Sequence, residues 1–183
     1  IELPSGRVIA TNLVGSYNAD NVMAAIAVGN HFGVTLEEAV AAIEAYVPSN
    51  NRSQMTKTER NTLIVDAYNA NPTSMEAALR NFANVESDNK VAMLGDMLEL
   101  GADSVAEHIR IAEMAIGLGL KHVCFVGSEF AKALESINTD DGVVAFATSA
   151  ELTQWLKETG LSDAVILIKG SRGTRMEKTM EAL

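Results

Sequence analysis

The stretch that decides the fold is residues 63–76, LIVDAYNANPTSME, where a short apolar run leads through a polar loop into a helix start. Residues 63–67 are too few for a helix and end in turn-forming residues, so they predict a buried strand. Residues 73–76 have the spacing of a capping box. The helix that follows carries three apolar residues on one face, Met75, Leu79 and Phe82. A buried strand that leads directly into a helix predicts one unit of a parallel sheet with crossover helices.

The same unit recurs toward the C-terminus. Four further apolar runs predict strands, at residues 91–94, 123–126, 143–147 and 165–168. Capping-box spacings at residues 104–107 and 174–177 predict two more helix starts. The apolar faces expected on these helices are Val105, Ile109, Ala112 and Ile116 in the first, and Met176, Met180 and Leu183 in the second. Other large side chains expected in the core are Phe130 and Trp155. The sequence therefore predicts an α/β fold with an open, mostly parallel sheet and helices on both faces.

The first fifty residues follow a different pattern. Residues 7–14 predict a strand and residues 18–32 an Ala-rich helix, and residues 35–38 form a capping box before a second helix. Four apolar residues share one face of that second helix: Leu36, Val40, Ile43 and Val47. One strand and two helices cannot bury both faces, so residues 1–49 are expected to be the tail of a neighbouring domain, and residues 50–183 the sheet domain. The chain opens on IELP without a methionine, and we expect it to be cut from a longer protein.

Composition limits the partners. The 183 residues include 14 Lys and Arg against 24 Asp and Glu, a formal net charge of −10, which disfavours nucleic acid and anionic membrane surfaces. The single cysteine, Cys124, lies in an apolar run and is expected to be a buried thiol. No apolar stretch approaches the roughly 20 residues that span a bilayer. A soluble, cytoplasmic protein is expected.

Polar side chains follow the predicted strands, where ligands bind in open parallel sheets. They are Asp66, Tyr68, Asn69 and Asn71 after the first strand, Asp96 and Glu99 after the second, and Lys169 and Arg172 after the last. The first group precedes a helix start, which favours an anion such as phosphate, although an Asn-Pro pair also simply begins a helix. The acids can hold a cation or an amine, or be solvated. The two cations can bind a carboxylate or phosphate, or balance nearby acids.

Several motifs are absent. The sequence contains no Gly-x-x-x-x-Gly-Lys-Ser/Thr and no Gly-x-Gly-x-x-Gly after a strand, so the chain alone lacks a complete nucleotide site. No His pair and no Cys/His group has metal-ligand spacing, and no metal site is predicted. His108, alone on a helix, is expected to be a packing or surface residue rather than a ligand.

Three motifs in order resemble the C-terminal domain of the Mur ligases. They are DAYNAN at residues 66–71, GDMLELG at residues 95–101 and KGSR at residues 169–172. Residues 15–25, GSYNADNVMAA, are similar to the end of the family's central ATPase domain. The resemblance implies a Rossmann-like domain that follows a short helical remnant of that ATPase domain. Within the family it is strongest to ligases that use ATP to join D-alanyl-D-alanine to UDP-N-acetylmuramoyl-tripeptide through an acyl phosphate, in peptidoglycan precursor synthesis.

The resemblance also implies roles for individual residues. The expected ATP contacts are Asn18, Asn21, Arg52, Asp66, Tyr68, Asn69 and Asn71. The expected substrate contacts are Asp96, Glu99, Lys169 and Arg172. No catalytic residue and no metal ligand is assigned within the chain, because the phosphate loop and the Mg²⁺ ligands belong to the rest of the central domain. The chain alone is therefore expected to be inactive.

Some positions depart from the family pattern. Tyr17 stands where many members have histidine, Ala67 where serine is frequent, and Asn51 where a glycine precedes Arg52. Two alternatives stay open: another amide ligase of the Mur or folylpolyglutamate type, and a non-catalytic binding module on the same fold.

Overall fold

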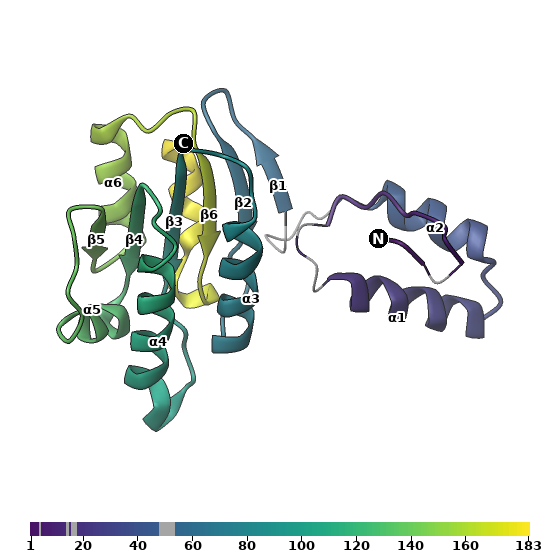
Figure 1. The fold of residues 1–183 in the computed structure, drawn as a ribbon, viewed down its shortest axis with the longest axis horizontal. Coiled ribbons are helices and arrows are strands. Elements are labelled where there is room, and N and C mark those ends of the chain that lie inside the picture. The colour runs from purple at the N-terminus through teal and green to yellow at the C-terminus, as the bar shows by residue number, and fades with distance from the viewer. Residues whose placement is uncertain (4, 14, 16–17, 48–53) are drawn as a thin grey trace.

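The structure, a computed structural model, describes residues 1–3, 5–13, 15, 18–47 and 54–183. Its centre is one six-stranded sheet in the order β1-β2-β6-β3-β4-β5 (Figure 1). The strands are β1 Gln54–Lys57, β2 Thr62–Asp66, β3 Lys90–Gly95, β4 His122–Val126, β5 Val143–Phe146 and β6 Val165–Lys169. All neighbours run parallel except β1 and β2, which are antiparallel. The predicted α/β fold is confirmed, and each predicted strand of the sheet lies within one residue of its observed bounds.

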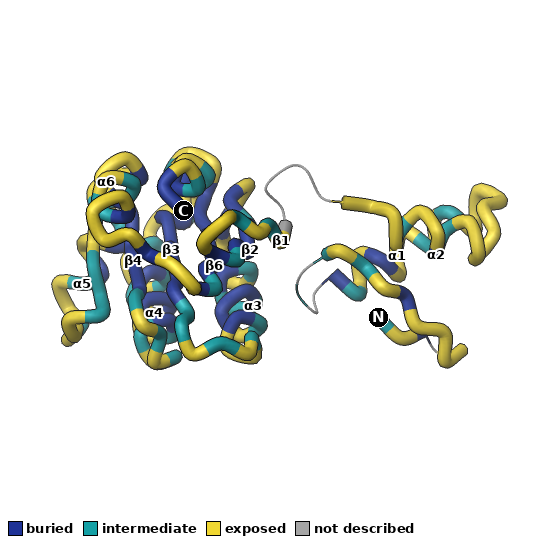
Figure 2. The backbone as a smooth tube through the Cα atoms, turned by 90° about the horizontal axis from the view of Figure 1, so that it is seen from above, coloured by how far each residue is buried: buried dark blue, intermediate teal, exposed yellow. Residues whose placement is uncertain are grey.

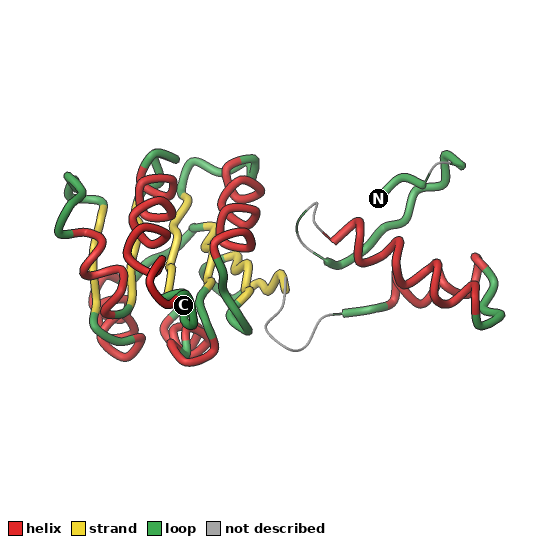
Figure 3. Tube along the Cα trace, turned by 90° about the horizontal axis from the view of Figure 1, so that it is seen from below, coloured by secondary structure: helices red, strands yellow, loops and turns green. Residues whose placement is uncertain are grey.

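Helices cover both faces of the sheet (Figure 3). The α-helices are α1 Asn18–His31, α2 Leu36–Ala45, α3 Pro72–Ala83, α4 Ser104–Ile116, α5 Ser128–Leu134 and α6 Ser149–Thr159. Short 3-10 helices are η1 Gly101–Asp103, η2 Arg172–Thr174 and η3 Met176–Ala182. Helices α3, α4 and α5 pack on one face, and α6 and η3 on the other. Successive β2 residues alternate between the two cores: Leu63 and Val65 face one, and Ile64 the other.

Most predicted core positions are confirmed. Phe82, Phe130 and Met176 are fully buried, and Trp155 is partly buried against the core. Cys124 is buried in β4, and burial raises the pKa of its thiol to about 12. The side chain is therefore a protonated packing group at neutral pH.

The apolar face of α4 differs from the predicted one. Its buried residues are His108, Ile111, Ala112 and Ala115, whereas Val105 is 43% exposed. The helix is rotated so that the histidine, rather than Val105, faces the sheet.

The predicted capping box forms in one of the four cases. Thr35 and Glu38 form the predicted capping box of α2. Helix α3, however, begins at Pro72, which fixes its first turn, and its N-cap is Asn71, two residues before the predicted Thr73. Helix α4 has no side-chain cap, since the Ser104 hydroxyl donates instead to Glu129 at 2.7 Å.

The third error lies at the end of the chain. Residues 172–182 form two 3-10 turns instead of a capped α-helix. Arg175, between the turns, has a φ of 53°, which is incompatible with a continuous helix. The Thr174 hydroxyl donates to the Ser171 carbonyl at 2.6 Å and so caps nothing.

The N-terminal segment buries little of its apolar surface. Among its described residues, the buried core consists of Leu3, Ile9, Val22 and Val40. The strand predicted at residues 7–14 is not found in their described part. Residues 7–9 instead pair with residues 1–3 through an isolated Glu2–Val8 bridge and the hydrogen bonds between Ile9 and Ile1. Figure 2 shows that much of α1 and α2 is exposed, and Phe32 and Val47 are 79% and 66% exposed. The predicted domain boundary at residues 48–51 lies outside the described residues.

Among the described residues, no helix combines the length and the apolar character needed to cross a membrane.

Candidate functional site

Three loops meet at the carboxyl edge of the sheet because β2, β6 and β3 are parallel neighbours. The register pairs Asp66 with Lys169, and Lys169 with Leu94. We call these loops the Asp66 loop (residues 66–71), the Asp96 loop (residues 96–100) and the Ser171 loop (residues 170–175). The sequence motifs at all three strand ends therefore lie together, as predicted.

Lys169 is a buried partner of Asp66 rather than a cation open to solvent. Its side chain is 1% exposed, and Nζ lies 2.5 Å from Oδ2 of Asp66 and 3.4 Å from the carbonyl oxygen of Asn69. A fully desolvated ammonium requires such partners. Lys169 thus holds the Asp66 loop in place through this ion pair. For Lys169 to contact a substrate anion, as predicted, the ion pair with Asp66 would have to break.

The two asparagines of the Asp66 loop shape its backbone. Asn69 Oδ1 accepts a hydrogen bond from the Ala70 N–H at 2.9 Å. Asn71 Oδ1 accepts from the Ser74 N–H at 2.8 Å, and the Ser74 hydroxyl accepts from the Asn71 N–H at 3.1 Å. Both asparagines are exposed. Within the described residues neither Nδ2 group donates a hydrogen bond, so each can serve a ligand.

Tyr68 and Arg172 lie together on the exposed rim. The Arg172 guanidinium carbon is 5.8 Å from the centre of the Tyr68 ring, a cation–π distance. Tyr68 is 40% exposed, and Arg172 is exposed. The pair joins the Asp66 loop to the Ser171 loop and presents a cation and a ring face to solvent.

Asp96 and Glu99, predicted to act together, point in different directions. Asp96 is 4% exposed, and its two oxygens accept from the Glu129 and Phe130 N–H groups at 3.0 and 2.9 Å. This carboxylate caps α5. Gly127, with a φ of 120°, makes room for it, because a Cβ there would lie 2.2 Å from Asp96 Oδ2. Glu99 is exposed, with a φ of 69°, and remains the acid of this loop that faces solvent.

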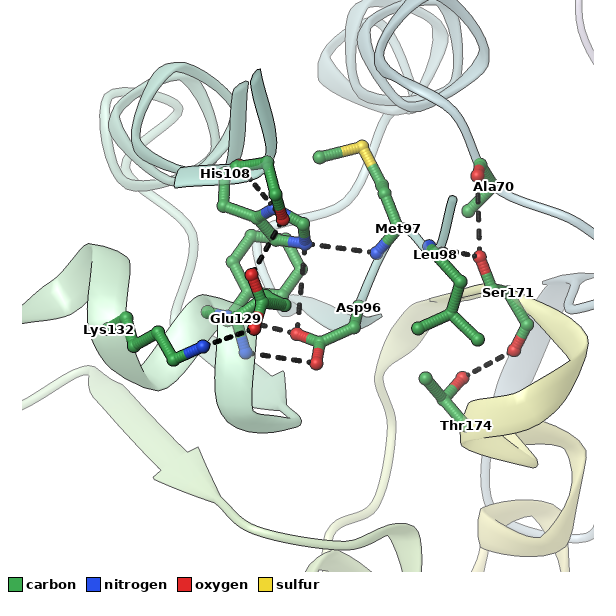
Figure 4. A network of polar contacts seen from close by, with 11 residues as sticks. Ala70, Asp96, Met97, Leu98, His108, Glu129, Lys132, Ser171 and Thr174 are labelled. Atoms are coloured by element: carbon green, nitrogen blue, oxygen red, sulfur yellow. Dashed lines mark hydrogen bonds and ion pairs between the residues drawn. The ribbon is translucent and has the colours of Figure 1, made fainter. Parts of the chain in front are cut away.

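His108 holds the start of the Asp96 loop (Figure 4). Its side chain is fully buried; Nε2 accepts from the Met97 N–H at 3.0 Å, and Nδ1 donates to the Ser104 carbonyl at 2.7 Å. With the Met97 N–H aimed at Nε2, the ring proton lies on Nδ1. The Phe130 ring packs edge-on at 4.6 Å. The packing role expected for His108 is confirmed.

Ser171 connects all three loops and was not singled out from the sequence. Its hydroxyl accepts from the Leu98 N–H at 3.0 Å and lies 3.3 Å from the Ala70 carbonyl, to which it donates (Figure 4). Its own N–H donates to the Asp96 carbonyl at 3.1 Å. The one signal in the sequence that could have identified Ser171 is its position two residues after Lys169, at the end of a strand.

Two hollows flank these connected loops. The first lies at the start of α3 and is lined by Asp66, Asn71, Pro72, Thr73, Ser74, Ala77 and Glu107. The second lies at the ends of β3, β4 and β5, and its polar lining includes Asp96, Ser128, Thr148, Ser149, Thr174, Arg175 and Lys178. Arg175 and Lys178 are two cations that were not predicted from the sequence. In the helix predicted to start at residues 174–177, both would be ordinary surface residues.

The remaining predicted residues lie outside this edge. Asn18 and Asn21 are on α1, where Asn21 Nδ2 donates to Asn18 Oδ1 at 3.1 Å. Arg52 and Tyr17 lie outside the described residues. In the described part of the chain, no three His, Cys, Asp or Glu side chains are grouped to hold a metal ion.

Known proteins match most of the chain. A UDP-N-acetylmuramoyl-tripeptide–D-alanyl-D-alanine ligase from Treponema pallidum is 34% identical over 96% of the chain and 39% of its own length. The ligase of the same name from Escherichia coli is 35% identical over 100% of the chain and 40% of its own length. The chain thus spans about two fifths of these relatives.

Solved structures agree. A MurF crystal structure from Acinetobacter baumannii superposes with a TM-score of 0.84 at 33% identity, over 97% of the chain and 40% of that protein. A MurF ligase from Thermotoga maritima in complex with ADP has a TM-score of 0.76 at 19% identity, which shows the shared fold. Residues 51–172 match the family described as Mur ligase, glutamate ligase domain. The chain belongs to the Mur ligase family.

Proposed function

We propose that this chain is the C-terminal part of a cytoplasmic, ATP-dependent ligase that joins D-alanyl-D-alanine to UDP-N-acetylmuramoyl-tripeptide in peptidoglycan precursor synthesis. Relatives with this activity in their names match nearly the whole chain. The observation that carries the proposal is that two connected loops border separate hollows at one sheet edge. In this proposal residues 1–49 end the central ATPase domain, and residues 50–183 form the domain that closes over it.

The Asp66 loop is assigned to the nucleotide. The α3 capping box occupies the Ser74 N–H and Pro72 has none, so the helix start offers an anion little beyond the Thr73 N–H. Recognition falls to exposed side chains instead: the Asn69 and Asn71 amides, and Arg172 over Tyr68. Asn18, Asn21 and Arg52 would contact ATP from the central-domain side.

ATP supplies the phosphoryl group that activates the tripeptide carboxylate as an acyl phosphate, and ADP leaves. The ligands of the Mg²⁺ that accompanies ATP are expected in the rest of the central domain. The contribution of the domain is to position both substrates and to exclude water from the activated carboxyl group.

The second hollow is assigned to the dipeptide. Arg175 and Lys178 place two cations beside it, on a protein whose net charge is −10, and suit the dipeptide carboxylate. Leu98 lines the hollow, and the neighbouring Glu99 is an exposed acid for the dipeptide ammonium group before it loses a proton. The amine nitrogen then attacks the acyl carbon, the new amide bond forms, and phosphate leaves.

Steady-state kinetics of the full-length protein test this assignment. Arg175→Gln and Lys178→Gln should each raise the KM for D-alanyl-D-alanine about tenfold, the loss expected for one charge-assisted hydrogen bond, and leave the KM for ATP unchanged. Asn69→Ala should raise the KM for ATP and leave the KM for D-alanyl-D-alanine unchanged. Lys157→Gln on the exposed face of α6 is the charge-matched control. If the cation variants behave like this control, the dipeptide does not bind in the second hollow.

A further inference from the structure

Ser171 is the one side chain that bonds the Asp66 loop to the Asp96 loop among the described residues. It is 3% exposed, and its hydroxyl uses both of its hydrogen-bonding roles, as acceptor from Leu98 and as donor to Ala70. Ala70 is itself 2% exposed, so its carbonyl has little access to water as a substitute partner. The Ser171 hydroxyl oxygen therefore links the position of the Asp66 loop to that of the Asp96 loop.

The geometry around Ser171 leaves little room for the loops to move separately. A Cβ on Gly170 would lie 3.0 Å from the Gly95 Cα, so the Ser171 loop is pressed against the end of β3. A Cβ on Gly173 would lie 2.8 Å from Leu98 Cδ1. Leu98 in turn precedes Glu99, whose left-handed backbone turns its side chain to solvent. A shift of the Leu98 N–H thus moves the residues that line the second hollow.

A second contact runs from the same strand to the Asp66 loop. Lys169, two residues before Ser171, bonds Asp66 Oδ2 and approaches the Asn69 carbonyl. The Asp66 loop is therefore held at both ends by β6 and its continuation. Ser171 alone extends this attachment to the Asp96 loop.

We propose that Ser171 is a positioning residue that couples the two substrate hollows, so that occupation of the nucleotide hollow orders the loop that receives the dipeptide. The proposal rests on the proposed function, which assigns the two hollows. Because linkage is reciprocal, the dipeptide must tighten nucleotide binding by the same factor by which the nucleotide tightens dipeptide binding.

The test uses the full-length ligase with Ser171→Ala. Affinity for a non-hydrolysable ATP analogue is measured with and without D-alanyl-D-alanine, and the ratio gives the coupling factor, which for linked sites is typically about 5 to 150. Ser171→Ala should bring this ratio close to one and raise the KM of both substrates. Hydrogen exchange should become faster in residues 66–71 and 96–100 together.

Thr179→Val is the matched control. The Thr179 hydroxyl is also fully buried and donates to a backbone carbonyl, that of Met176 at 2.7 Å, but among the described residues it forms no hydrogen bond to either loop. It should lower stability without changing the coupling factor or the exchange of the two loops. Ser171→Cys, which keeps a side chain of the same shape but forms weaker hydrogen bonds, should show the Ala effects in smaller measure, and serves if the Ala variant does not fold.

The outcomes separate the two proposals. An active wild type whose Ser171 variants keep the coupling factor, or change it no more than Thr179→Val does, overturns the inference and leaves the ligase function standing. A full-length wild type that does not ligate the dipeptide overturns the proposed function, and this inference with it.

Discussion

At the scale of single residues, the charged and polar side chains at the strand ends are mostly engaged in hydrogen bonds and ion pairs within the domain. Lys169 neutralises Asp66, Asp96 caps α5, and His108 holds a backbone N–H. Each is buried or nearly so, and each has its partners within the domain. The side chains left to meet ligands are those on the rim, such as Glu99 and Arg172.

Lys169→Met should destabilise the chain by about 3 kcal/mol, because Asp66 would keep its charge in a mostly buried position without a partner. Urea unfolding measures the loss. The double variant Asp66→Asn/Lys169→Met should recover part of it, since no unpaired charge remains. If the double variant loses the sum of the two single effects, the two side chains do not interact energetically.

At the scale of elements, the helix starts carry the Asp66 and Asp96 loops. Helix α3 begins where Asn71 turns the chain out of the Asp66 loop, and α5 begins where Asp96 reaches across from β3. The ends of these helices therefore fix the shape of the site, and their caps can be tested separately from substrate binding.

Asn71→Ala should lower the free energy of unfolding by about 1 kcal/mol, the usual cost of losing an N-cap. Asn71→Asp keeps the accepting oxygen and should restore the stability. Thermal unfolding without substrate gives both values. Equal stability of Asn71→Ala and the wild type would mean that the cap contributes nothing, and that Asn71 acts on ligands alone.

Glu129→Gln should lower the stability of the protein in a pH-dependent way, because the Glu129 carboxylate on α5 accepts a hydrogen bond from Ser104 on α4. Hydrogen bonds from Lys132 and then from Ser104 lower the pKa of Glu129 below 4.5. A lowered pKa in the folded state means that the carboxylate stabilises the protein above about pH 4.5 and that this contribution is lost as the pH falls through the folded value. The melting temperature of the variant should thus lie below that of the wild type near neutral pH and converge with it in acid.

Glu113→Gln is the control for this effect, because Glu113 is exposed on α4 and forms no ion pair within the described ranges. A difference between Glu129→Gln and the wild type that stays constant from neutral to acid pH would show that the Glu129 charge is not involved.

The sequence predicts the strands better than the helix starts for a physical reason. Buried strands such as residues 123–126 are continuous apolar runs, whereas a capping box is a four-residue spacing that other partners can override. Pro72 moves one start upstream, and Glu129 takes the Ser104 hydroxyl from a distance of 25 residues in the sequence. Strand β1, with the sequence QMTK, lacks an apolar run and owes its place to pairing with β2.

For the site, too, local features could be predicted from the sequence and contacts with distant residues could not. Strand ends and their polar loops could be located, because parallel strands bring them to one edge. The inward direction of Lys169 and Asp96 could not be predicted, since it depends on β2 and α5, which lie far away in the sequence. Arg175 and Lys178 were missed because the 3-10 turns that place them by the second hollow arise from tertiary packing.

At the scale of the whole molecule, two regions differ in how much they bury. The sheet domain has an apolar core on each face. The described part of the first 47 residues buries one small core and exposes large apolar side chains. This asymmetry supports the proposal that the N-terminal segment completes another domain, and that substrates bind where that domain faces the carboxyl edge of the sheet.

The most direct measurement is mass spectrometry of the product made by the full-length protein from ATP, UDP-N-acetylmuramoyl-tripeptide and D-alanyl-D-alanine. We expect a UDP-linked muramoyl pentapeptide, with one ADP and one phosphate released per amide bond, and no turnover by residues 1–183 alone. A product extended by a single amino acid or by glutamate, or turnover by the isolated chain, would contradict this expectation.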